Sequence, residues 1–368
     1  MSDVTARGAP AGPEPEPEAR PGRESADSGS DSDSDSGSGS GAGPWRWRLL
    51  LAWAGVVGWG TWAAVRLAGG DALPGIGALA TPPLAVTPFV AALSPIPVLL
   101  ALLLRRWWAA VAASVVALSL VAAVAPRAFV DEGPAARGPV VRVLAANLYF
   151  GQADAGELVE LVRRTRPDVL SVQELTAEAA VRYEKAGLGR LLPHRVLDTR
   201  WGAAGSGLYS RHPLRRLPPP GETRFATPRA EFTVQGNRRV EVTAVHPVPP
   251  ISSAAYRSWK ADMALLPSAT RAGEDAAAGA GAPVRILAGD FNATLDHAHL
   301  RRLIGRGYAD AADRAGAGLT STWGDGGTSP PLTIDHVLVD RRCAVKGFAV
   351  HDVRGSDHRA VFAEVRLP

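Results

Sequence analysis

Cysteine is nearly absent from this chain of 368 residues, and Cys343 is the only one. A single thiol excludes a disulfide within the chain and a zinc site built from cysteines. We interpret Cys343 as a small buried residue beside a strand. Two motifs are also missing: the GxxxxGK[ST] loop that cradles nucleotide phosphates and the GxSxG turn that carries a hydrolase serine. Nucleotide binding of the first type and serine-hydrolase chemistry are therefore not expected.

The first 43 residues contain no aromatic side chain and few large apolar ones. Nine acidic residues against three arginines give this stretch a net charge of −6. It has too little apolar surface to offset the entropy that ordering would cost. The sequence therefore predicts a disordered acidic tail over residues 1–44, and the low-complexity run DSGSDSDSDSGSGSG within it indicates no function.

Long apolar runs without interior charge follow the tail, at residues 49–68, 84–104 and 107–125. Each is close to the roughly 20 residues that a helix needs to cross a hydrocarbon core. Tryptophans near their ends suit the membrane–water interface. The second run is interrupted by prolines, so a kinked or re-entrant segment is the alternative there. We predict an all-α transmembrane region over residues 45–126, with about three helices or, failing that, two.

Positive charge is distributed unequally around these runs. Arg46 and Arg48 precede the first run, and Arg105 and Arg106 separate the second from the third. Because arginine favours the cytoplasmic side of a membrane, three spans would leave the tail inside and everything after residue 126 outside. We therefore expect a multi-pass protein of the cell membrane with an extracytoplasmic C-terminal domain. Two spans would reverse that orientation.

From residue 140 the pattern changes to short apolar runs separated by amphipathic stretches. Runs typical of buried strands lie at residues 140–146, 168–172, 206–210, 230–234, 239–245, 284–289, 332–340 and 359–367. Helical spacing occurs at residues 158–162 and about 254–269, and residues 127–139 are typical of a linker. From Gly138 onward, thirty Lys and Arg stand against twenty-four Asp and Glu. This mild excess suits an anionic substrate but falls short of a nucleic-acid footprint.

Several of these apolar runs end at, or begin from, an Asn, Asp, Glu or His, residue types that are common in catalytic sites. A sheet holds such strand-end side chains in fixed relation at one rim, as a catalytic site requires. Turn formation explains Asn or Asp at these positions, but it does not explain Glu174, His246 or His358. Carboxylates and amides suit a hard cation such as Mg²⁺ or Mn²⁺. Histidine beside a carboxylate suits proton transfer, so the set indicates metal-assisted attack of water on a phosphate.

In this order the residues resemble the endonuclease/exonuclease/phosphatase superfamily, in the form of a membrane-anchored bacterial member that is deoxyribonuclease-like. The matching pieces are Asn147, QE at 173–174, SGLYSRHPL at 206–214, AVHP with His246, GDFNA at 289–293, IDHVLV at 334–339 and SDHRAV at 356–361. They cover essentially all of residues 140–368, and GDFN, IDH and SDH are highly specific as an ordered set. The resemblance implies an α/β fold, a four-layer sandwich of two packed mixed sheets flanked by helices.

The resemblance also implies which side chains bind metal and substrate. The metal ligands would be Glu174, Asn147 and Asp357, and the cofactor Mg²⁺ or Mn²⁺. The substrate phosphate would be held by Asn292, Asn147 and His246.

Catalytic roles are implied for four residues. Asp290 would orient or deprotonate the attacking water, and His358 would contact the phosphate or transfer a proton. Asp335 would orient the ring of His358, and His246 could serve as the acid for the leaving group. We interpret His336 as a strand residue. The remaining histidines are interpreted as surface or loop residues: His194, His212, His297, His299 and His351.

The activity implied is hydrolysis of a phosphodiester by in-line attack of an activated water, with a nuclease-like substrate favoured. A phospholipid or lipid-linked phosphate is the alternative, because the helices would hold the site near lipid head groups. A membrane-bound binding module without catalysis is the remaining hypothesis. The expected partners are the membrane and a nucleic acid or lipid head group, with no protein partner. The loop at 320–332 resembles substrate-side loops, with Trp323 as a stacking surface or a core residue.

Overall fold

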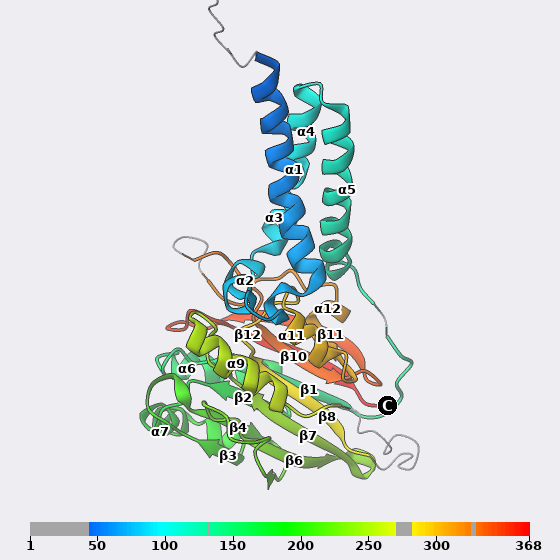
Figure 1. Ribbon diagram of the computed structural model, residues 1–368. Coiled ribbons are helices and arrows are strands. Elements are labelled where there is room, and N and C mark those ends of the chain that lie inside the picture. Colours follow the sequence, from blue (N-terminus) through cyan, green and yellow to red (C-terminus); the bar gives the residue numbers. More distant parts are fainter. Residues whose placement is uncertain (1–43, 132, 270–281, 325–328) are drawn as a thin grey trace, which may run out of the picture. The chain divides into compact units, whose positions relative to one another are not determined.

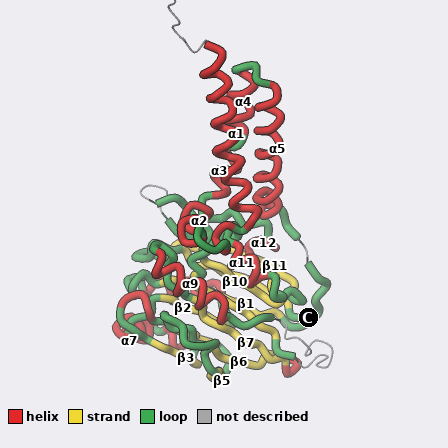
Figure 2. Tube along the Cα trace, viewed as in Figure 1, coloured by secondary structure: helices red, strands yellow, loops and turns green. Residues whose placement is uncertain are grey.

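Residues 140–368 form two packed β-sheets between layers of helices in the computed structural model (Figures 1 and 2). The structure describes residues 44–131, 133–269, 282–324 and 329–368. The predicted acidic tail before Pro44 lies outside the described residues, as do Glu132 of the predicted linker and residues 325–328 of the loop with Trp323.

The first sheet has the strand order β11-β12-β1-β2-β4-β3. Its strands are β1 (Val140–Asn147), β2 (Val169–Gln173), β3 (His194–Asp198), β4 (Ser206–Ser210), β11 (Ala344–Asp352) and β12 (Arg359–Arg366). The second sheet has the order β5-β6-β7-β8-β10-β9. Its strands are β5 (Arg215–Leu217), β6 (Arg229–Val234), β7 (Arg238–Val245), β8 (Val284–Asp290), β9 (Tyr308–Asp310) and β10 (Asp335–Asp340).

All eight predicted strands are present, with one clear difference in extent. The run at 332–340 becomes a strand only from Asp335, because Leu332 instead pairs with Trp323 in an isolated bridge. Strands β3, β5, β9 and β11 were not predicted. Three of them are only three to five residues long, and β11 carries Gly347 at an irregularity in its pairing with β12.

The inner faces of the two sheets bury valine, alanine and isoleucine against each other. Val143, Val361, Val242, Ile286 and Val337 are all fully buried in this central core. Burial of aliphatic side chains at about 25 cal/mol per Å² is the main stabilising contribution here. The outer faces are covered by helices, so the predicted four-layer α/β sandwich is confirmed.

Helices α6 (Ala155–Thr165) and α7 (Ala177–Ala186) cover the first sheet through Leu158, Leu161 and Tyr183. Helix α6 begins where the carboxylate of Asp154 accepts a hydrogen bond from the backbone of Glu157. The second sheet is covered by α9 (Ser253–Leu265) and α11 (Ala298–Ile304), which pack Trp259 and Leu300 onto it. The short helices α8 (Leu188–Leu191) and α12 (Ala311–Arg314) complete the domain.

Strand pairing places the ends of four strands at one rim. The parallel pair β1–β2 sets Asn147 beside Gln173, with Glu174 next in the chain. In the second sheet, the antiparallel pair β8–β10 sets Asp290 opposite Asp335. Because the two sheets pack face to face, these ends meet, as expected for a site built on a rigid scaffold.

Residues 44–128 are helical, comprising α1 (Pro44–Ala68), α2 (Gly77–Leu84), α3 (Thr87–Leu93), α4 (Pro95–Leu103) and α5 (Trp107–Val124). Two helices are long and apolar enough to cross a membrane, Arg46–Ala68 and Trp107–Ala128. A third crossing depends on the segments Gly77–Leu84 and Thr87–Leu103, which are bent by 63° at the break between them. The break occurs among the prolines that interrupt the second predicted run, since proline lacks the N–H that would continue a helix.

A buried carboxylate joins these helices to the sandwich. Asp296 accepts hydrogen bonds from Arg66 at the end of α1 (2.5 Å) and from Arg127 after α5 (2.7 Å). Its side chain is fully buried, and both arginines are only 7% exposed. Burial alone raises the pKa of Asp296, but the bonds from the arginines outweigh it and hold that pKa below its ordinary value. The carboxylate is therefore ionised and ties both helix ends to one point.

Replacing Asp296 with alanine should lower the free energy of unfolding by about 3–5 kcal/mol, because two buried arginines would lose their counter-charge. Thermal unfolding of the full-length protein in detergent micelles measures the change. Glu160→Ala is the matched control: it removes one member of an exposed pair with Arg163 and should cost less than about 1 kcal/mol. Equal losses in the two variants would contradict a structural role for the buried cluster.

Candidate active site

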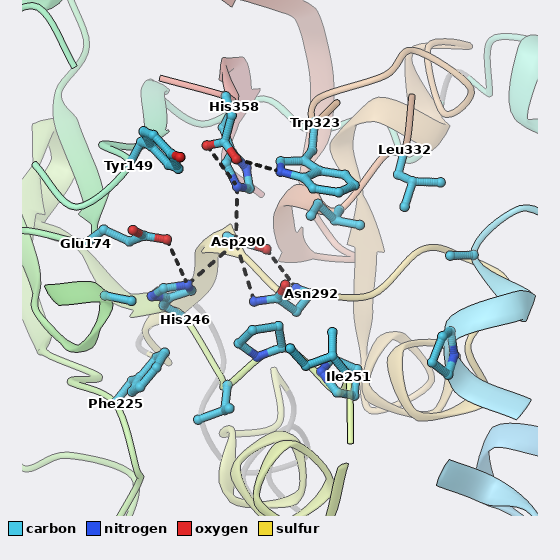
Figure 3. Close-up of a pocket in the computed structure, with 18 of the residues that line it drawn as sticks. Tyr149, Glu174, Phe225, His246, Ile251, Asp290, Asn292, Trp323, Leu332 and His358 are labelled. Atoms are coloured by element: carbon cyan, nitrogen blue, oxygen red, sulfur yellow. Dashed lines mark hydrogen bonds and ion pairs between the residues drawn. The ribbon is translucent and has the colours of Figure 1, made fainter. Parts of the chain in front are cut away.

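Two buried carboxylates, Glu174 and Asp290, lie in one pocket at the shared rim (Figure 3). The Asn147 side chain donates hydrogen bonds to Glu174 Oε1 and to Asp290 Oδ2, each at 3.1 Å. The other oxygen of Glu174 accepts from the backbone N–H of Phe150 at 2.7 Å. The side chains of Glu174 and Asp290 are 10% and 2% exposed. Asn147 thus joins a residue of the first sheet to one of the second.

The backbone around this cluster is strained. Among the described non-glycine residues with positive φ are Tyr149 (45°), Phe150 (53°), Glu174 (57°) and Asn292 (48°), all at this rim. Such conformations cost of order 1 kcal/mol or more each, and they persist where the surroundings impose them. Gly289 precedes Asp290 with φ of 145°, and a Cβ there would lie 2.3 Å from the Val245 carbonyl oxygen. Glycine is therefore required for β7 and Asp290 to come this close.

His358 faces Asp290 and is oriented from behind by Asp335. Its Nδ1 lies 2.9 Å from Asp335 Oδ2, and its Nε2 lies 3.7 Å from Asp290 Oδ2. Burial alone lowers the pKa of His358, but Asp335 and Asp290 outweigh burial and raise it. The backbone N–H of Asp335 is itself fixed by Thr322 Oγ1 at 3.0 Å. The ring is thus held with one nitrogen directed at the carboxylate cluster.

His246 lies on the opposite side of Asp290. Its Nε2 is 3.6 Å from Asp290 Oδ2 and 3.8 Å from Glu174 Oε1. Burial is the main reason that the pKa of His246 is lowered to about 3, so its imidazole ring is neutral at ordinary pH. A neutral ring can donate a hydrogen bond to a phosphate oxygen without adding a buried charge.

Asn292 and Asp357 complete the rim. The Asn292 side chain donates to the Pro247 carbonyl at 3.0 Å, and its backbone N–H donates to Asp290 Oδ1 at 2.7 Å. Asp357 is 41% exposed, and its Oδ2 accepts from the indole of Trp323 at 3.0 Å. Trp323 is therefore a partly exposed pocket residue that holds Asp357. The structure brings all eight predicted site residues to one pocket or its supporting strands: Asn147, Glu174, His246, Asp290, Asn292, Asp335, Asp357 and His358.

The donor set fits a hard divalent cation. Burial raises the pKa of both Glu174 and Asp290, so the two carboxylates are costly to ionise side by side without a counter-charge. Donor atoms of Asp290, Asp335 and His358 also lie within 4.8 Å of one another. Asp335, however, is engaged with the His358 ring at 2.9 Å. Glu174 lines the pocket with a carboxylate that no histidine ring holds so closely, and the ligand set predicted from the sequence, Glu174, Asn147 and Asp357, stays a prediction.

His336, next to Asp335, points away from this cluster, as predicted for a strand residue. Its ring nitrogens lie 2.7 Å from Asp310 Oδ2 and 2.8 Å from the Ala293 carbonyl, and the side chain is fully buried. His297 lies in a loop, as expected, but is buried against α2, where its Nε2 is 2.8 Å from the Thr81 carbonyl.

Thr81 and Pro82 of α2 and the following residue, Ala85, line the same pocket and were not predicted. They carry no catalytic chemistry. Only the break in the proline-rich apolar run indicated that this segment leaves a straight helix.

Asp290→Asn should raise the free energy of unfolding by on the order of 1 kcal/mol at pH 8 in the presence of a chelator. The folded pKa of Asp290 lies above its unfolded value of about 3.9, so the ionised group destabilises the fold above that folded pKa. Asparagine keeps the oxygen that accepts from the Asn292 backbone N–H but loses the acceptor for Asn147, so the expected gain is smaller than removal of the buried charge alone would give. The control Asp352→Asn alters a carboxylate that is 90% exposed and should change little. Thermal unfolding that shows Asp290→Asn destabilised would contradict this account.

One comparison with known proteins identifies the family of this chain. A family model described as the endonuclease/exonuclease/phosphatase family matches residues 144–358, more than half of the chain. A search of curated proteins finds no match.

Solved structures with a similar fold include three bacterial proteins. An endonuclease/exonuclease/phosphatase from Beutenbergia cavernae is 18% identical over 62% of this chain and 72% of its own, with a TM-score of 0.43. A mannosyl-6-phosphatase from Bacteroides thetaiotaomicron is 17% identical over 61% and 99%, with a TM-score of 0.45. Sphingomyelinase C from Streptomyces griseocarneus is 16% identical over 61% and 99%, with a TM-score of 0.44. The family assignment depends on the match over residues 144–358 and not on these likenesses: this chain belongs to the endonuclease/exonuclease/phosphatase family of phosphoester hydrolases.

Proposed function

We propose that this protein is a membrane-anchored, divalent-metal-dependent hydrolase that cleaves a phosphodiester. The observation that carries the proposal is the convergence of Glu174, Asp290 and His358 around Asn147 at one buried rim. Asn147 contacts all three, with its Nδ2 lying 3.4 Å from His358 Nε2. Buried carboxylates whose pKa values burial raises are enriched at functional sites, and here they stand beside a histidine in one pocket.

The residues have distinct roles in the proposed reaction. Asp290 orients the attacking water and accepts its proton, while Asn292 and His246 hold the phosphate oxygens. The water oxygen forms a bond to phosphorus as the opposite P–O bond breaks, which leaves a phosphomonoester and an alcohol. His358, oriented by Asp335, contacts the phosphate or transfers a proton. Neutral His246 donates a hydrogen bond to the departing oxygen, and His358, whose pKa is raised, is the group that can give that oxygen a proton.

Mg²⁺ or Mn²⁺ would be held by Glu174, Asn147 and Asp357. When bound, it would neutralise charge on the phosphate and the departing oxygen. Phe150 and Trp323 position two of these ligands: the Phe150 backbone N–H donates to Glu174, and the Trp323 indole donates to Asp357.

The proposed organisation is an acidic tail (1–44), a transmembrane region (45–126), a linker (127–139) and a catalytic domain (140–368). Arg66 and Arg127 both contact Asp296, so the ends of α1 and α5 lie on the same side of the helical region. The chain must therefore return between them, and Thr87–Leu103 would make that return over about 25 Å. Three passes support an extracytoplasmic catalytic domain, with the arginine-flanked N-terminus of α1 inside.

Turnover of bis(p-nitrophenyl) phosphate by the full-length protein should require Mg²⁺ or Mn²⁺ and disappear with a chelator. His358→Ala should reduce the rate at least about 100-fold while the unfolding temperature is kept, because a positioned proton-transfer group is lost. Glu174→Gln should raise the metal concentration needed to shift the unfolding temperature, a readout independent of activity. His194→Ala on β3 is the matched histidine control. Chelator-resistant turnover, or a fully active His358→Ala, would exclude this site.

The rate should fall as the pH is lowered, because Asp290 must be ionised to accept a proton from water. Burial raises the pKa of Asp290, so the loss should begin above the ordinary aspartate value of about 3.9. A profile of kcat/KM against pH at saturating metal tests this. A rate that stays constant from pH 9 down to pH 5 would contradict a raised pKa of Asp290 in the metal-loaded protein.

A further inference from the structure

The pocket over the carboxylate cluster has an apolar wall. Its volume is about 450 Å³. Phe225, Ile251 and Leu332 form part of this wall from the catalytic domain. Pro82 of α2 and Ala85, the residue after α2, add to it from the helical region. Ile251 is 81% exposed, which is unusual for a large aliphatic side chain beside a charged site.

The described residues that line this pocket include no lysine and no arginine. Polynucleotides are bound largely through lysine and arginine contacts to several phosphates along the strand. The sequence favoured a nuclease-like substrate over a lipid. The pocket wall reverses that order, because it offers apolar surface where a strand of nucleic acid would need positive charge.

A second cavity of about 400 Å³ continues the apolar surface. It lies against α3 and α5, where Phe89, Val121 and Val124 line it, and it shares Ala85 and Leu332 with the first pocket. Arg127 also lines it, but that arginine is paired with Asp296. The two cavities therefore adjoin at Ala85 and Leu332, one over the carboxylate cluster and the other beside α5, which is long and apolar enough to span a membrane.

Specific buried hydrogen bonds fix the position of α2 against the catalytic domain. His297, next to the buried Asp296, lies 2.8 Å from the Thr81 carbonyl through Nε2. The carboxylate of Asp71, just before α2, accepts from the backbone N–H groups of Ala298 (2.8 Å) and His299 (3.1 Å). Asp71 is fully buried. These bonds hold one wall of the substrate pocket on a segment of the membrane region.

We propose that the substrate is a membrane lipid phosphoester. Its phosphate binds at Glu174 and Asp290, and its hydrocarbon chain passes between Ala85 and Leu332 into the cavity beside α3 and α5. The inference rests on the proposed function, since it names the substrate class of the same site. A lipid can enter this path from the bilayer and remain in apolar surroundings. The path has this property because residues of both the catalytic domain and the helical region line it.

The test is a series of alkyl p-nitrophenyl phosphates with methyl, butyl, octyl and dodecyl chains, hydrolysed by full-length protein in nanodiscs. In the wild type, kcat/KM should rise by up to about fourfold per methylene until the path is filled. Ala85→Trp, which blocks the junction, and Leu332→Ser, which makes it polar, should each flatten that rise. Val57→Trp is the matched control, because Val57 is an exposed residue of α1 outside both cavities. Comparison with Val57→Trp cancels partitioning of long chains into the bilayer.

The outcomes separate the substrate class from the activity itself. A steep chain-length dependence in wild type and Val57→Trp, lost in both junction variants, supports the lipid substrate. The same slope in all proteins, no slope in wild type, or faster cleavage of plasmid DNA or RNA than of the dodecyl ester overturns it. If one of these results overturns the lipid substrate, the proposed function still holds when wild-type protein hydrolyses the methyl ester and the His358→Ala variant does not. Absence of any such hydrolysis overturns both.

Discussion

Face-to-face packing of the two sheets is the constraint on which the site depends. Each inner face is a continuous aliphatic surface, and burying both requires the sheets to lie against each other. Once they do, the ends of β1 and β2 meet the ends of β8 and β10 at one rim. Asn147 then joins Glu174 of one sheet to Asp290 of the other. The site is thus a consequence of core packing. The packing holds the charged groups close together, although their mutual repulsion would separate them.

Core packing holds the site residues in positions that are energetically unfavourable for the residues themselves. Burial raises the pKa values of Glu174 and Asp290, and strained backbone holds Glu174 and Asn292 at positive φ. Only a well-packed scaffold can maintain groups that are individually unfavourable. In our proposal, these groups bind a cation and a phosphate and activate a water molecule. His358 is directed toward the same place by Asp335, which lies across the β8–β10 pair from Asp290.

The helices are joined to the sandwich by a few buried polar contacts. Asp296 binds the ends of α1 and α5, and Asp71 and Thr81 meet the loop and helix that follow Asp296. Removing one partner of such a pair is costly, so the arrangement is specific rather than a general apolar contact. Its result is that α2 forms a wall of the pocket. In our proposal, this makes the membrane region part of substrate selection as well as an anchor.

The sequence by itself determined the fold family, most of the strands and the residues that meet at the rim. Each of these is written in local signals: alternating apolar runs, and the polar residues after them in a specific order. The sequence could not indicate that Thr81, Pro82 and Ala85 enter the site, nor that Asp296 and His297 hold them there. Apolar residues of a membrane segment look alike whether they face lipid or a pocket. Only tertiary packing, which brings residues more than 200 positions apart into contact, decides between those two surroundings.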